Sequence, residues 1–148
     1  MPLPQPDDLT SLVLRTDFGD EGAWNAVRAA LDAADDHPHA TYVSDLRFAG
    51  VGVQALVAEE AAADEVEQIV HLFLADAATM KDPGHPLLAV DLWDEPGRTF
   101  RVPARWFPDI SANLSIANMD FAEFADAADT SGTFHGFDQG SRGSGRRS

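Results

Sequence analysis

Short apolar runs that alternate with segments of helical spacing constrain the fold of this chain more than any other feature of its sequence. The runs are rich in Val, Leu and aromatic residues and are bounded by turn-forming residues, as strands are. Five runs are predicted to be strands, at residues 11–17, 40–45, 68–75, 86–91 and 98–102. Strands that alternate with helices indicate a layered α/β domain with a mostly parallel sheet and flanking helices.

Three segments are predicted to be helices, at about residues 21–34, 53–66 and 121–128. In the first, Trp24, Val27 and Leu31 recur at spacings of three and four, which places them on one helical face. The last is a C-terminal helix that opens with Asp120 and has Glu123 three residues later, the pattern of a capping box.

Three further segments complete the predicted structure: an ambiguous apolar run, a turn and a connector. The apolar run at residues 66–75 fits both helical spacing and a buried strand, and we predict a strand from about Gln68. The turn at residues 94–97 joins the last two predicted strands as a β-hairpin. Residues 103–108 contain two prolines and are predicted to be an irregular connector.

One domain is expected, because a chain of 148 residues usually buries a single core. The prolines of residues 1–8 predict an extended N-terminal tail. Residues 138–148 are rich in Gly, Ser and Arg and predict a disordered tail, so the α/β domain should span residues 9–137.

The charge limits the possible partners. The chain has 25 acidic and 10 basic residues, a net charge of -15. Residues 138–148 hold one of these acids and three of these bases, so residues 1–137 keep 24 acids and 7 bases, a charge of -17. Such a surface repels the phosphates of nucleic acids and anionic membranes, so neither is expected as a partner. A basic protein, a polyamine or a divalent cation fits better.

The expected compartment is the cytoplasm. No apolar run approaches the roughly 18 to 20 residues of a membrane span, and the N-terminus lacks the pattern of a secretory signal. The absence of cysteine excludes disulfides, thiolate zinc sites and cysteine nucleophiles. The motifs G-x-S-x-G, H-E-x-x-H and G-x-x-x-x-G-K-[ST] do not occur, and the G-x-G-x-x-A match at residues 50–55 does not directly follow a predicted strand, so an enzyme is not the favoured class.

Several phrases resemble a small family of bacterial proteins that is classified only as a domain of unknown function. They lie at residues 12–18, 73–79, 85–92, 98–102 and 113–121, and the most specific is Asn113-Leu-Ser-Ile-Ala-Asn-Met-Asp-Phe121. The likeness spans roughly residues 12–137. It implies a single domain and supplies no catalytic residue, substrate or cofactor.

Four of the apolar runs end in an aspartate: Asp17, Asp45, Asp76 and Asp91. If the strands are parallel, these carboxylates share one end of the sheet, where α/β proteins place their ligands. Clustered carboxylates would suit Mg²⁺ or Ca²⁺, although no cofactor is the favoured expectation. The simpler interpretation, which we favour, is that each aspartate caps a helix or forms a turn.

A second group of residues could contact a partner or an anionic ligand: Trp93, Arg98, Arg101 and Arg105. The arginines are more simply explained as partners of the surplus carboxylates, while an exposed Trp93 would suit a binding hot spot. His71 lies in an apolar run and is interpreted as a strand residue with polar neighbours rather than as a catalyst.

The sequence therefore favours an acidic cytoplasmic binding or accessory protein that engages a basic protein partner, in the manner of an inhibitor or immunity protein. The alternative is a divalent-metal-dependent enzyme built on the strand-end aspartates. The two differ in a simple observation, which is whether the four aspartates converge.

Overall fold

A computed structural model describes residues 10–33, 40–61, 69–93, 95–115, 120–128 and 132–134. Its strands are β1 (Ser11–Arg15), β2 (Ala40–Val43), β3 (His71–Ala75), β4 (Leu87–Asp91) and β5 (Thr99–Val102). Its helices are α1 (Glu21–Ala33), α2 (Val53–Ala61), α3 (Ala77–Lys81), α4 (Phe107–Ser115) and α5 (Phe121–Asp126). The predicted tails, residues 1–8 and 138–148, lie outside the described residues.

The five strands form one mixed sheet in the order β2-β1-β3-β4-β5. β1 is parallel to both β2 and β3, whereas β4 is antiparallel to β3 and β5 is antiparallel to β4. The prediction of a mostly parallel sheet is therefore wrong. A parallel return needs a crossover of about a dozen residues or more. The connection between β3 and β4 contains only the one-turn helix α3, so β4 runs back beside β3.

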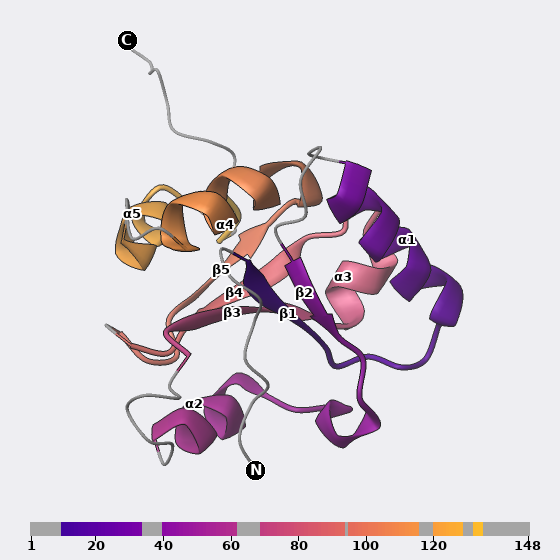
Figure 1. Ribbon diagram of the computed structural model, residues 1–148, viewed down its shortest axis with the longest axis horizontal. Helices are drawn as coiled ribbons and strands as arrows, with labels where there is room; N and C mark the ends of the chain where they lie inside the picture. Colours follow the sequence, from indigo (N-terminus) through magenta and orange to yellow (C-terminus); the bar gives the residue numbers. More distant parts are fainter. Residues whose placement is uncertain are drawn as a thin grey trace, which may run out of the picture.

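Helices cover the two faces of the sheet unequally (Figure 1). Helices α1, α3, α4 and α5 lie over one face, and α2 lies over the other. Alternate residues of β1 serve the two cores, since Val13 packs in the core under α1 and Leu12 and Leu14 pack in the core under α2. The domain thus has a central sheet between two apolar layers.

The predicted strands, the hairpin and the start of the C-terminal helix are confirmed. All five strands are found, and the ambiguous segment becomes β3 from His71, while residues 62–68 lie outside the described residues. The predicted hairpin is the pair β4 and β5. The C-terminal helix begins as predicted, since the side chain of Asp120 and that of Glu123 form the capping box of α5.

The predicted connector at residues 103–108 is instead largely helical. A 3-10 turn covers Ala104–Trp106, and α4 follows it directly. Pro108 does not stop this helix because it occupies the first turn, where no backbone N–H is needed. Phe107 and Ile110 are then buried in the core under α1 and α4. Among the described residues, no helix is both long and apolar enough to cross a membrane.

Candidate functional site

The parallel strands β1, β2 and β3 end side by side, at what we call the carboxyl end of the sheet. The chain leaves β1 through α1 toward β2, then returns through α2, on the other face, to β3 on the far side of β1. Strand order therefore reverses between β1 and β3. In open α/β sheets, such a switch point at the carboxyl ends of the strands is where ligands bind.

Three of the four predicted aspartates lie at this end, because Asp17, Asp45 and Asp76 follow β1, β2 and β3. Asp91 lies at the opposite end of the sheet. β4 is antiparallel to β3, and Asp91 pairs with His71, the first residue of β3. The four carboxylates would share one end of the sheet only if all the strands were parallel, and the antiparallel β4 places Asp91 at the other end.

The carboxylates at the carboxyl end serve local backbone structure. Asp17 Oδ1 accepts a hydrogen bond from Gly19 N at 2.9 Å, and Asp45 Oδ1 accepts one from Arg47 N at 3.1 Å. Asp76 caps α3, so the interpretation as turn and cap residues fits all three. Within the described residues, no group of three or more His, Asp or Glu side chains is arranged to hold a metal ion.

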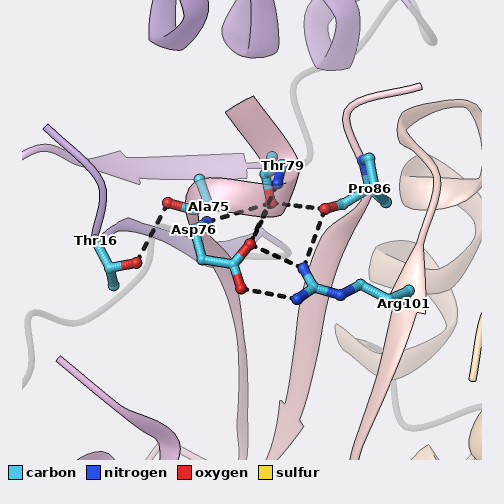
Figure 2. A network of polar contacts seen from close by, with 6 residues as sticks. All are labelled: Thr16, Ala75, Asp76, Thr79, Pro86 and Arg101. Atoms are coloured by element: carbon cyan, nitrogen blue, oxygen red, sulfur yellow. Dashed lines mark hydrogen bonds and ion pairs between the residues drawn. The ribbon is translucent and has the colours of Figure 1, made fainter. Parts of the chain in front are cut away.

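Asp76 and Arg101 form the main polar cluster at this end (Figure 2). Arg101 Nη1 donates to Asp76 Oδ1 at 2.9 Å, and Arg101 Nη2 donates to Asp76 Oδ2 at 2.8 Å. Because β4 lies between β3 and β5, this bidentate ion pair clamps two strands that are not neighbours. The arginine pairs with a surplus carboxylate, as the simpler interpretation expects.

Thr79 completes the clamp. Its hydroxyl donates to the carbonyl oxygen of Pro86 at 2.6 Å, and its backbone N–H donates to Asp76 Oδ1 at 3.2 Å. Burial raises the pKa of Asp76, but the hydrogen bonds and charge of Arg101, together with the Thr79 hydrogen bonds, outweigh burial and hold that pKa below its usual value. Both oxygens of the Asp76 carboxylate thus have partners within the protein. We therefore interpret the cluster of Asp76, Thr79 and Arg101, which we call the clamp, as structural.

Arg15, the last residue of β1, is a buried cation that the sequence prediction missed. Its Nε donates to the backbone oxygen of Asp17 at 2.9 Å, and its Nη1 donates to Glu21 Oε2 at 2.8 Å and to Ser44 Oγ at 3.2 Å. Its Nη2 is buried and has no hydrogen-bond partner. An arginine inside an otherwise apolar strand run was the available signal.

The opposite end of the sheet presents Trp93 on the β4–β5 turn, which we define as residues 92–98, with Asp94 outside the described residues. Asp91 is only 2% exposed, and its two carboxylate oxygens accept hydrogen bonds from Trp93 N at 2.9 Å and from Glu95 N at 2.8 Å. The buried carboxylate therefore fixes the backbone that carries Trp93, whose side chain is 62% exposed.

Arg98 ties the same turn to the domain. It forms ion pairs with Glu95, at 3.0 Å, and with Asp126 of α5. The hydrogen bond that Arg98 donates to the carboxylate of Asp126 is the largest cause that raises the pKa of Arg98 above its usual value. Like Arg101, Arg98 pairs with carboxylates. Arg105 is exposed, and its guanidinium lies 5.7 Å from the ring centre of Trp106.

Gly97 allows the chain to reverse direction within the turn, because glycine readily adopts a positive φ. Its φ is +96°, and a Cβ there would lie 3.2 Å from Gln54 Nε2. We expect Gly97→Ala to lower the free energy of unfolding by about 1 to 2 kcal/mol, because side-chain-bearing residues are strained at positive φ. Urea denaturation measures this, with Gly52→Ala as the matched control, since a Cβ at Gly52 meets open space. Equal losses in the two variants would contradict the strained turn.

His71 joins a buried polar chain near the same end. Its Nε2 lies 3.0 Å from Ser11 Oγ, which lies 2.7 Å from Ser111 Oγ of α4. The polar neighbours that the sequence predicted for His71 are therefore present. Burial lowers the pKa of His71 to about 4, although the charge of Asp91 acts in the opposite direction. Ser11 and Ser111 are fully buried, so this chain is structural.

In the part of the chain that the structure describes, the fold and its polar clusters define an α/β domain with a single sheet, a switch point at its carboxyl end, and a turn whose backbone at Trp93 and Glu95 is held by Asp91. A family model for DUF6924, a domain of unknown function, matches residues 10–137. The chain belongs to this family, which confirms the resemblance seen in the sequence. The comparison with curated proteins gives no significant match.

Proposed function

We propose that this protein is a cytoplasmic binding or accessory protein that engages a basic protein partner through the β4–β5 turn, as an inhibitor or immunity protein does. The observation that carries the proposal is the 62% exposed Trp93 on a turn fixed by the buried carboxylate of Asp91. Tryptophan is the residue type most enriched among binding hot spots.

A rigid turn favours binding more than a mobile one. Asp91 holds the backbone at Trp93 and Glu95, and Arg98 links the turn to Asp126 of α5. Little conformational entropy is then lost when a partner orders the turn. An indole presented in this way provides a large apolar contact at low entropic cost.

A second exposed apolar side chain comes from an adjacent segment. The backbone N–H of Leu92 donates to the carbonyl oxygen of Val70 at 2.9 Å, so Val70 is held next to the residue that precedes Trp93. Val70 and Trp93 are two of the three large hydrophobic residues that are exposed among those the structure describes, and the third is Leu46. Val70 and Trp93 would supply the apolar part of such an interface.

The charge of the chain favours a basic partner. A net charge of -15 accelerates association with a cationic protein and repels acidic ones. Glu95 on the turn and Asp126 beside it have exposed carboxylates, which would face a partner's cations at the rim of the interface.

The first test is capture of partners from the organism that encodes the chain, with the wild type, Trp93→Ala or Leu46→Ala immobilised. Leu46→Ala is the matched control because Leu46 is similarly exposed but lies after β2, in another part of the fold. We expect a basic protein that is retained by the wild type and by Leu46→Ala at low salt, is released at high salt, and is lost with Trp93→Ala. Retention of only neutral or acidic proteins, or equal retention by all three, would overturn the proposal.

A further inference from the structure

Arg15 combines deep burial with an incomplete set of partners. Its side chain is 2% exposed, and it is the largest of the fully buried side chains among the described residues. An arginine presents five N–H donors and always carries its charge. Three of these donors are used, by Asp17, Glu21 and Ser44. The two N–H groups of Nη2 remain without an acceptor.

The aromatic neighbours do not replace that acceptor. The guanidinium carbon lies 4.4 Å from the ring centre of Phe18 and 5.4 Å from that of Trp24. Rings stack on the face of a guanidinium, whereas its N–H groups point outward in the plane. Buried donors without acceptors destabilise a fold, so each calls for an explanation, of which a bound ion is one.

The carboxylate of Glu21 marks where an anion can bind. It contacts Arg15 through Oε2, while its own side chain is 71% exposed. Because the Glu21 side chain lies largely in water, it can turn away into solvent, and the buried charge of Arg15 that it leaves behind would then need another anion to compensate it. The departure of Glu21 opens the Nη1 and Nη2 edge of the guanidinium, which matches the two oxygens of a carboxylate.

The place in the fold supports a ligand at this position. Arg15 ends β1 at the carboxyl end of the sheet, beside the switch point, and the loop that follows it leads into the N-terminus of α1. Helix N-termini and their dipoles favour anions. Asp20 already accepts a hydrogen bond from Ala23 N of that helix at 3.0 Å.

The local charge selects among anions. Three carboxylates, Asp17, Asp20 and Glu21, lie on the same short segment. Their repulsion grows with the charge of the ligand, so a singly charged carboxylate is favoured over a phosphate dianion. We propose that Arg15 is the anchor of a binding site for a small molecule that bears a carboxylate group, and that Glu21 occupies the site until the ligand displaces it.

The test uses acetate as the probe and the ¹⁵N and ¹H resonances of Arg15 Nε as the readout, in titrations at constant ionic strength. Glu21→Gln removes the competing charge and keeps the side-chain length. We expect saturable shifts with the wild type and a dissociation constant that is lower by about five-fold or more for Glu21→Gln, because acetate no longer competes with the Glu21 carboxylate for the buried charge of Arg15. Arg28→Gln is the matched control, because the Arg28 guanidinium carbon also lies near Trp24, at 5.7 Å from its ring centre. The affinity of Arg28→Gln for acetate should equal that of the wild type.

Calorimetric titration extends the test to Arg15→Met, which should abolish acetate binding while its circular dichroism remains that of the wild type. If that variant does not fold, the comparison of Glu21→Gln with the wild type decides alone. The proposed site would be overturned if neither the wild type nor Glu21→Gln showed saturable acetate binding, or if Glu21→Gln bound acetate no more tightly than the wild type. Tighter binding of inorganic phosphate than of acetate would overturn the assignment to carboxylates.

Discussion

Acidification from neutral pH to about pH 4 is expected to lower the free energy of unfolding of the wild type by about 3 kcal/mol more than that of a His71→Gln variant. Burial lowers the pKa of His71 from 6.5 to about 4 in the folded protein. Between these two values the unfolded chain binds a proton that the folded chain rejects, so stability falls as the pH falls through this window.

Urea denaturation at a series of pH values measures this difference. Glutamine can keep a hydrogen bond with Ser11 but does not titrate, and the other titrating groups are common to both proteins. The two stability curves should therefore separate below about pH 6.5 and become parallel again below about pH 4. Curves that stay parallel throughout would show that His71 does not titrate as the buried chain with Ser11 and Ser111 requires.

The second large effect is expected at the clamp between β3 and β5. We expect Arg101→Met to lower the free energy of unfolding by about 2 to 3 kcal/mol, because it leaves the Asp76 carboxylate without its bidentate partner. The pair is about three-quarters buried, with exposed fractions of 25% for Arg101 and 27% for Asp76. Arg101→Lys keeps the positive charge but not the two parallel N–H donors of the guanidinium, so it should lower the free energy of unfolding by less than Arg101→Met does.

A double-mutant cycle with Asp76→Asn isolates the pair, since the asparagine can still cap α3. Chemical denaturation of the two single variants and the double variant at neutral pH gives the coupling energy. The pKa of Asp76 is lowered in the folded state, so its contribution is present above about pH 4 and is lost as the pH falls further. If the losses in the free energy of unfolding of the two single variants add up to that of the double variant at neutral pH, the two side chains are not coupled and the clamp is contradicted.

The sequence predicts those parts of the fold that depend on local patterns. Apolar runs identify all five strands, and the spacing of Trp24, Val27 and Leu31 identifies α1, since all three are buried on its inner face. Caps can also be predicted, because Asp76 and Asp120 contact backbone groups only three residues away.

Other features depend on contacts between distant residues. The direction of β4 follows from the short connection after β3, and the placement of α4 follows from the burial of Phe107 and Ile110 in a core that other elements complete. The clamp joins Asp76 to Arg101, residues that become neighbours only across an intervening strand. The free donor of Arg15 depends on the positions of Glu21 and Ser44, which no spacing in the sequence indicates.

The most direct test of the proposed function is the dissociation constant of the captured basic partner for the wild type and for Trp93→Ala, measured by calorimetry with both proteins purified. A hot-spot tryptophan predicts a loss of affinity of about 30-fold or more, with Leu46→Ala equal to the wild type. A Trp93→Ala dissociation constant equal to that of the wild type would contradict binding through the β4–β5 turn.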